Sequence, residues 1–443
     1  MSYKCLSTLS FLIVGLLANF ATGAINWDAM RVKHAWDDIP ANWECLGNTT
    51  AGATIKLHIA LKPRQESALI DTLSEVSNPI HPRLVIFTLH PLVPLFTCAA
   101  PFRYGAYLST EQVSDLVSPH PDALDLVRAW LLHHGIRTSS ISTTHGGEWL
   151  TVTDVLVARA NQLLGASYQL YRNLKTNNTI VRTVSYALPD VLHRYIQTIA
   201  PTTHFPSTRG MRHTLHRRTS GAAPERAQAA SGKVVTARQD QHITPSKLRW
   251  LYQTVGYTHA AKPNMNRLGI VGFDDEYPSQ SDLTLFLTKY RTKAKDARFS
   301  VVQLNGGMYN PSNPIDNANL GIQYATAIAH PTPVVFYSVG GDTQWDLDGR
   351  PILSDMYLEW FGTILEEENP PLTVSMPYGE PERDVPKAYA YALCRLFAQL
   401  ASRGVTVLVP SGNDGVGAEG CVNEHGNVRF IPEFPSSCTC DFI

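Results

Sequence analysis

The sequence predicts an α/β protein in which a smaller α+β domain precedes a doubly wound parallel β-sheet. With 443 residues the chain exceeds one average domain, so two domains are expected. From Ile243 onward, short runs of consecutive apolar and β-branched residues alternate with longer segments of helical spacing. Runs of the first kind are typical of strands buried on both faces of a parallel sheet, and the alternation is typical of α/β folds.

Each element of the C-terminal part follows from this alternation. The predicted strands are residues 268–273, 334–339, 372–375 and 405–409. The predicted helices between them are residues 281–290, 318–329, 356–366 and 386–403. Connections of this kind are expected to cross over with right-handed geometry.

The N-terminal part, residues 25–205, carries a mixed pattern. Residues 55–61 alternate apolar and polar side chains, which predicts a half-buried strand. Residues 69–76 and 123–134 have helical spacing. Residues 84–103 stand apart, because they are strongly apolar and contain three prolines, which exclude a straight helix and suit a central strand poorly.

Two segments outside these domains are expected to direct and process the chain. Residues 1–24 combine Lys4, an apolar run and small residues, the pattern of a signal peptide, so a secreted, extracellular protein is expected. Residues 206–242 contain almost no large apolar side chains and predict an exposed linker, either a protease-sensitive activation segment or a passive tether.

Charge and cysteine content narrow the possible partners. The formal charge of −1 predicts no nucleic-acid partner and no membrane partner. Of the seven cysteines, Cys421 and Cys438 are the pair we expect to be linked, although spacing alone does not establish connectivity. No pattern typical of a bound metal or of a phosphate-binding loop is present, so no cofactor is expected.

A series of segments in fixed order resembles the sedolisin family, the secreted serine-carboxyl peptidases of the fungal tripeptidyl-peptidase type. In the N-terminal part they are Trp36-Asp-Asp-Ile-Pro-Ala-Asn-Trp43, Tyr104-Gly-Ala-Tyr-Leu-Ser109 and Val127-Arg-Ala-Trp-Leu-Leu-His-His-Gly-Ile136. In the C-terminal part they are residues 243–252, 272–277, 305–307, 336–341, 377–380 and 411–416. The resemblance implies a zymogen with a pro-domain at residues 25–205 and a subtilisin-like peptidase domain at residues 243–443. It also implies polypeptide substrates, release of tripeptides from N-termini, cleavage of the linker at low pH, and the chain's own pro-domain as a partner.

The resemblance further implies a Ser nucleophile with a Glu as base, an Asp four residues later that orients the Glu, and a second Asp that donates to the oxyanion. The acid pair corresponds here to Asn317 and Gly321, which provide neither a base nor a carboxylate. Asp316 is interpreted instead as the N-cap of the helix, with Leu320, Tyr324, Ala327 and Ile328 as its core stripe. The oxyanion position corresponds to Asn413, whose amide could still donate.

The Ser turn and the calcium site of the family are expected after the last matching segment, Phe434–Cys438, but residues 439–443 match nothing. We therefore expect a truncated domain with no intact catalytic residue and no calcium ligands in this chain. Residues 84–103 and 439–443 are interpreted as translated intron sequence or another gene-model fault, or else as an insertion and a truncation in a decaying paralogue.

Three functions follow from these expectations. The chain could be an active acid tripeptidyl-peptidase, a non-catalytic homologue that binds peptides, or a fragment that fails to fold. The loss of the acid pair at Asn317 and Gly321 favours an inactive member of the family.

Overall fold

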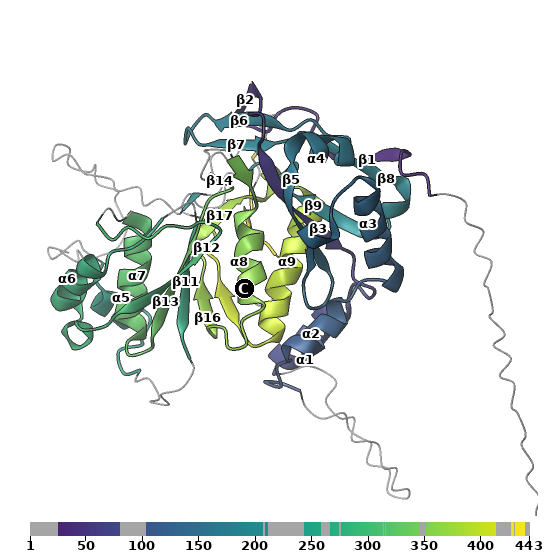
Figure 1. The fold of residues 1–443 in the computed structure, drawn as a ribbon. Helices are drawn as coiled ribbons and strands as arrows, with labels where there is room; N and C mark the ends of the chain where they lie inside the picture. The colour runs from purple at the N-terminus through teal and green to yellow at the C-terminus, as the bar shows by residue number, and fades with distance from the viewer. Residues whose placement is uncertain are drawn as a thin grey trace, which may run out of the picture.

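The computed structural model describes residues 25–79, 103–206, 209–210, 243–257, 266–273, 276–312, 314, 316–345, 351–412, 427–428 and 430–438. The N-terminal and C-terminal parts lie side by side and are in contact along the helices α8 (Met356–Ile364) and α9 (Lys387–Ser402) (Figure 1). Among the helices of these residues, none is long and apolar enough to cross a bilayer.

A parallel sheet forms the centre of the C-terminal part, as the sequence predicts, but it has five strands where four were predicted. Its order is β12-β13-β11-β16-β18, and every neighbouring pair is parallel. The strands are β11 (Leu268–Gly272), β12 (Phe299–Leu304), β13 (Val334–Val339), β16 (Thr373–Ser375) and β18 (Thr406–Leu408). The sequence analysis missed β12 because this strand lies at the edge of the sheet and keeps polar residues among its apolar ones.

Helices cover both faces of this sheet. The helices α6 (Gln280–Tyr290) and α7 (Asp316–Ala329) pack on one face, and α8 and α9 pack on the other (Figure 1). Neighbouring residues of β13 show the division, because Phe336 belongs to the core under α6 and α7 whereas Tyr337 belongs to the core under α8 and α9. The alternation of side chains along a strand produces this arrangement.

The buried face of α7 differs in part from the predicted stripe. Ala318, Ile322 and Ala327 are buried, whereas Ile328 is 42% exposed and Leu320 and Tyr324 are only half-buried. The helix contacts α5 (Pro245–Leu251), α6, β11 and β13, so its buried residues do not form a single stripe. Asp316 is the first residue of α7, and its predicted capping role stays a prediction.

A six-stranded sheet forms the centre of the N-terminal part, in the order β14-β15-β3-β5-β4 with β9 also paired to β3. Its strands are β3 (Thr54–Leu61), β4 (Ile141–Thr143), β5 (Trp149–Leu156), β9 (Ile196–Ala200), β14 (Thr343–Trp345) and β15 (Pro351–Leu353). The last two come from the C-terminal part, and Ile352 pairs with Thr54 in parallel register. The two parts therefore share one sheet.

The prediction of a half-buried strand at residues 55–61 was correct for the strand and wrong for its burial. All residues of this range except Lys56 are buried. One face packs in the N-terminal core through Ile55, Leu57 and Ile59, and Ala60 on the other face packs in the core of the C-terminal part. Contact between the two parts thus covers the face that the sequence pattern predicts to be exposed.

The remaining elements surround these two sheets. The helices are α1 (Ala68–Ser77), α2 (Thr110–Val117), α3 (Pro121–His133), α4 (Val157–Leu164) and α5 (Pro245–Leu251). The small sheets combine β1 (Met30–Ala35) with β8 (Ser185–Pro189), and β2 (Trp43–Asn48) with β6 (Gln169–Asn173) and β7 (Thr179–Arg182). A third small sheet contains β10 (Arg209–Gly210), β17 (Tyr378–Pro381) and β19 (Glu433–Phe434).

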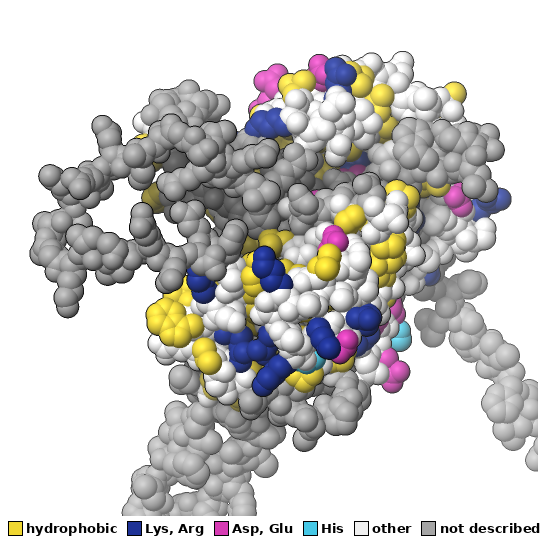
Figure 2. Space-filling view, turned by 90° about the vertical axis from the view of Figure 1, so that its left-hand side faces the viewer, with side chains coloured by type: hydrophobic (Ala, Val, Ile, Leu, Met, Phe, Trp, Pro, Cys, Tyr) yellow, Lys and Arg dark blue, Asp and Glu magenta, His cyan; other side chains and the backbone are white. Residues whose placement is uncertain are grey.

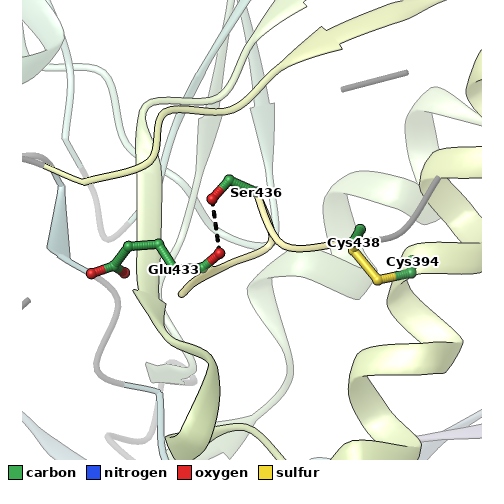
Figure 3. The surroundings of a disulfide bond; sticks show 4 residues. All are labelled: Cys394, Glu433, Ser436 and Cys438. Carbon is green, nitrogen blue, oxygen red and sulfur yellow. Dashed lines mark hydrogen bonds between the residues drawn. A yellow bond between two sulfur atoms is a disulfide. The ribbon is translucent and has the colours of Figure 1, made fainter. Parts of the chain in front are cut away.

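The expected pairing of Cys421 with Cys438 was wrong. Cys438 is linked to Cys394 on α9, with their Cα atoms 5.4 Å apart (Figure 3). The turn that leads to Cys438 is held by the Ser436 hydroxyl, which donates to the carbonyl oxygen of Glu433 at 2.8 Å. Proximity in space, across 44 residues of sequence, decides this pair.

Several sequence predictions lie outside the described residues. These are the signal peptide at residues 1–24, residues 84–102 of the anomalous segment, most of the linker, Asn413 and residues 439–443. They stay predictions.

Candidate functional site

The two positions of the expected acid pair lie on α7, one helical turn apart. Asn317 and Gly321 have the spacing that places two residues on one face of a helix. The Asn317 side-chain amide donates to Glu276 Oε1 at 3.0 Å. At the position expected for the catalytic base, the helix therefore has a neutral amide, and that amide faces the carboxylate of Glu276.

Gly321 contributes no side chain, and the space around it does not require glycine. A Cβ atom at this position would lie 3.6 Å from Ile270 Cγ2, which is ordinary van der Waals contact. A longer side chain could therefore start from this position without displacing the backbone. Crowding therefore does not explain why a glycine stands at this position.

Glu276 is the carboxylate that the sequence analysis missed. It follows β11 at the carboxyl end of the central sheet, and its Oε2 accepts a hydrogen bond from the Tyr378 hydroxyl at 2.8 Å. Ligands and catalytic groups gather at this end of open α/β sheets. The signal was in the sequence, because the acidic run Asp274-Asp-Glu276 directly follows a predicted strand and lies inside a segment that resembles the family.

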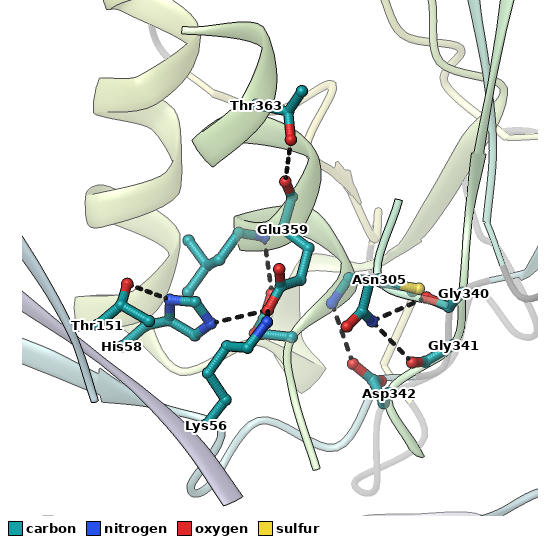
Figure 4. Close-up of polar contacts among 12 residues, drawn as sticks. Lys56, His58, Thr151, Asn305, Gly340, Gly341, Asp342, Glu359 and Thr363 are labelled. Atoms are coloured by element: carbon teal, nitrogen blue, oxygen red, sulfur yellow. Dashed lines mark hydrogen bonds and ion pairs between the residues drawn. The ribbon is translucent and has the colours of Figure 1, made fainter. Parts of the chain in front are cut away.

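The loops that follow β12 and β13 are joined at the carboxyl end of the sheet. Asn305, which follows β12, donates through Nδ2 to the carbonyl oxygens of Gly340 and Gly341 at 3.3 and 3.2 Å (Figure 4). Glycine is required at 307, because a Cβ atom there would lie 2.2 Å from the carbonyl oxygen of Ser338. These contacts hold the loop after β12 against the loop after β13.

The strand β17 connects this carboxylate to an extended peptide segment. Tyr378, which donates to Glu276, is its first residue. The chain's own β10 lies antiparallel on β17, with Arg209 opposite Gly379 and Gly210 opposite Tyr378. An extended segment from the expected linker thus occupies the edge of a strand that belongs to the candidate site.

The N-terminal part contacts this region through buried ion pairs. His204 Nε2 lies 2.9 Å from Glu380 Oε1, and the His204 ring stacks on Tyr389 with 4.5 Å between ring centroids. Arg182 Nη2 lies 3.2 Å from Asp342 Oδ2, and both side chains are buried. In both pairs the cation comes from the N-terminal part and the carboxylate from the C-terminal part.

These surroundings shift the acidity of the buried groups. Burial alone would lower the pKa of His204, but the charge and hydrogen bond of Glu380, helped by Asp355 and Asp342, raise that pKa above its ordinary value. Burial raises the pKa of the Asp342 carboxyl, and the Arg182 guanidinium opposes this shift only in part. Both groups therefore bind protons more readily in the assembled structure.

A second polar contact between the parts lies on α8. Glu359 Oε1 lies 2.6 Å from Lys56 Nζ and 3.3 Å from His58 Nε2, and Thr151 contacts the other nitrogen of His58 at 3.2 Å (Figure 4). Burial would raise the pKa of Glu359, but His58 and Lys56 lower it below its ordinary value. A cavity of about 250 Å³ opens beside these residues, and its lining includes neither Asn317 nor Glu276.

Comparison with known proteins finds relatives along nearly the whole chain. A family model described as "Pro-kumamolisin, activation domain" matches residues 100–205. Tripeptidyl-peptidase SED2 of Arthroderma otae is 28% identical over 445 residues, which cover 96% of this chain and 69% of that protein. Tripeptidyl-peptidase SED4 of the same organism is 28% identical over 449 residues, covering 98% and 67%. These matches support a relationship of this chain to the sedolisin-type fungal tripeptidyl-peptidases.

The sedolisin relatives give the candidate site its context. The matched activation domain coincides with most of the part that contributes Arg182 and His204 to the buried contacts. The relatives named above are tripeptidyl-peptidases, which supports a peptidase-like function here. The chain spans 69% and 67% of the length of those two relatives.

The structure brings together some of the residues expected from the sedolisin pattern. Asn317 and Gly321 lie on one helix, as expected, and Glu276 accepts a hydrogen bond from Asn317. Asn413 lies outside the described residues. The described part of the chain contains no group of three or more His, Cys, Asp or Glu side chains placed to hold a metal ion. The expectation about calcium therefore stays a prediction.

Proposed function

We propose that this chain is a secreted sedolisin homologue that binds peptides along β17 and does not hydrolyse them by the serine–carboxylate route of its family. The observation that carries the proposal is the pair formed by Asn317 and Glu276 beside the bare Gly321. In this proposal the central parallel sheet is the subtilisin-like scaffold, residues 25–205 are the pro-domain, and residues 206–242 are the linker.

The chemistry of Asn317 supports the loss of catalysis. A general base must accept a proton from the nucleophile, with a pKa near the operating pH. An amide cannot do this, and Asn317 already uses its Nδ2 to donate to Glu276. Because Gly321 has no carboxylate to orient a base, the helix provides neither member of the pair.

The edge of β17 supports peptide binding. Extended peptides are commonly bound by adding a strand to a sheet edge, where main-chain hydrogen bonds provide affinity and side-chain pockets provide specificity. The residues Arg209 and Gly210 occupy this position on Gly379 and Tyr378. A peptide supplied in trans is expected to compete with them.

Two measurements on the purified full chain test the proposal. Release of tripeptides from a polypeptide is measured at acidic pH, with the Arthroderma otae relative as the positive control. Binding of a fluorescent oligopeptide is measured by polarisation, for the parent chain and for a variant with Arg209→Pro and Gly210→Pro, which weakens strand pairing. We expect no tripeptide release, and tighter peptide binding by the proline variant. Tripeptide release by the parent, or the absence of peptide binding in both proteins, would overturn the proposal.

A second candidate function is peptide hydrolysis in which Glu276 replaces the missing carboxylate. The observation that favours it is the placement of Glu276, whose two oxygens contact Asn317 at 3.0 Å and Tyr378 at 2.8 Å. If the parent chain releases tripeptides and Glu276→Gln abolishes the release while Glu75→Gln does not, this candidate replaces the first. Glu75 is the control because it lies on α1, in the N-terminal part.

A further inference from the structure

Positive charge is concentrated on one face of the C-terminal part. Residues 289–298, at the end of α6 and through the short helix η3 (Thr292–Ala294), contain five basic residues and a single acid, Asp296. The basic residues are Lys289, Arg291, Lys293, Lys295 and Arg298. None of them takes part in the ion pairs found among the described residues.

A sixth cation reaches this group from α5. Arg249 lies close enough to Arg291 to lower the pKa of that guanidinium, after burial as the larger cause. Arg249 Nη2 donates to the carbonyl oxygens of Thr254 and Val255 at 3.2 and 2.9 Å. The loop after α5 is therefore tied beside the end of α6, and Arg291 Nε has no hydrogen-bond partner among the described residues.

Large apolar side chains are exposed beside these cations. On α5 and the loop that follows, Trp250 is 74% exposed, and Leu251, Tyr252, Val255 and Tyr257 are between 59% and 71% exposed. On α6, Leu285 is 70% exposed. Figure 2 shows the side of the molecule that carries α5 and α6, where Lys and Arg side chains gather with apolar side chains beside and between them. Exposed apolar groups gathered in this way mark an interaction surface.

We propose that this face, formed by residues 247–257 and 285–298 and called here the α5–α6 face, binds the surface of an anionic lipid membrane. Lys and Arg side chains are attracted by anionic headgroups, and Trp and Tyr side chains are stable at the boundary between headgroups and acyl chains. A surface of this composition lies on a membrane without spanning it.

The aliphatic residues favour lipid over a soluble polyanion. An acidic polysaccharide would satisfy the cations and could stack on Trp250 or Tyr252, but it would leave Leu251 and Leu285 in water. A lipid surface covers both kinds of side chain. The formal charge of −1 for the whole chain gives no sign of this basic face, because acidic residues elsewhere in the sequence balance its positive charge.

Co-sedimentation of the purified full chain with vesicles tests this proposal. Vesicles of phosphatidylcholine alone are compared with vesicles that also contain phosphatidylserine. The test variant carries Lys293→Glu and Lys295→Glu, and the control variant carries Arg128→Glu and Arg137→Glu, two exposed positions in the N-terminal part. Each basic residue near an anionic surface contributes about fivefold to partitioning, so the test variant should bind the anionic vesicles at least about 25-fold more weakly.

The control variant and the parent should bind alike, and binding by both should weaken as salt increases. Trp250→Ser should also weaken vesicle binding while leaving its salt dependence unchanged. Equal binding to neutral and anionic vesicles would overturn the proposal, as would equal losses in the test and control variants. Binding to soluble heparin without binding to anionic vesicles would show a polyanion site instead and would also overturn it.

Discussion

Replacement of His204 by Leu should destabilise the contact between the two parts in a pH-dependent way. His204 and Glu380 are 2.9 Å apart, with side chains that are 4% and 0% exposed. Removing one partner of a buried ion pair typically costs about 3 kcal/mol, a change on the order of 100-fold in the folding equilibrium, because a charge is left buried without its partner. We expect a loss of this size near pH 6, which lies below the ordinary histidine pKa of about 6.5.

The sign of the pH dependence follows from the direction of the pKa shift. The pKa of His204 is raised in the folded structure, because the carboxylates of Glu380, Asp355 and Asp342 outweigh the effect of burial. The stabilisation is therefore complete below the unfolded pKa and is lost as the pH rises through the folded pKa. The difference in stability between parent and variant should be largest in mild acid and should shrink as the pH increases.

Urea-induced unfolding at a series of pH values measures this difference, with the disulfide kept oxidised. His133→Gln is a suitable control, because His133 is an exposed residue at the end of α3. Its stability should follow that of the parent at every pH. A His204→Leu difference that does not vary with pH, or that grows toward alkaline pH, would refute the assignment of a charged His204 in the contact.

Three further predictions concern stability. Replacing Cys394 and Cys438 by Ala should lower the free energy of unfolding by about 4 kcal/mol, because the bond closes a loop across 44 residues. Urea unfolding measures this change, and a reductant should lower the free energy of unfolding of the parent but not that of the variant. Gly321→Ala should stabilise the chain by about 1 kcal/mol, because a Cβ atom fits beside Ile270; a lower melting temperature would contradict this. Burial raises the pKa of the Glu148 carboxyl, so Glu148→Gln should raise the free energy of unfolding at neutral pH. This gain should shrink as the pH falls through the pKa of Glu148 in the folded protein. A gain that persists in acid would exclude burial of the charged carboxylate as the cause.

The fold of the C-terminal part could be predicted because the sequence pattern of each strand and helix lies within that element. The strands at residues 268–272 and 334–339 are buried on both faces, so their apolar runs are continuous. The edge strand at residues 299–304 was missed because an edge position permits polar residues. Helices such as 387–402 carry their apolar spacing in the sequence itself.

The candidate site was only partly predictable. The substitutions at Asn317 and Gly321 are a prediction from the sequence, because only the resemblance to the family assigns those positions. The contact of Asn317 with Glu276, 41 residues earlier, is not visible, because it depends on how α7 and the end of β11 are packed. The predictions of a Cys421–Cys438 pair and of a half-buried strand at residues 55–61 were wrong for the same reason.

The sequence by itself determined the class of fold, the order of most elements and the resemblance to the sedolisin family, and it predicts the loss of the acid pair. Periodicity and motif order are local properties, so they can be read along the chain. Only the tertiary structure decided which carboxylate faces Asn317, which segment lies on β17 and that Arg249 lies beside Arg291. Those contacts join residues that are distant in sequence, and packing rather than local pattern brings them together.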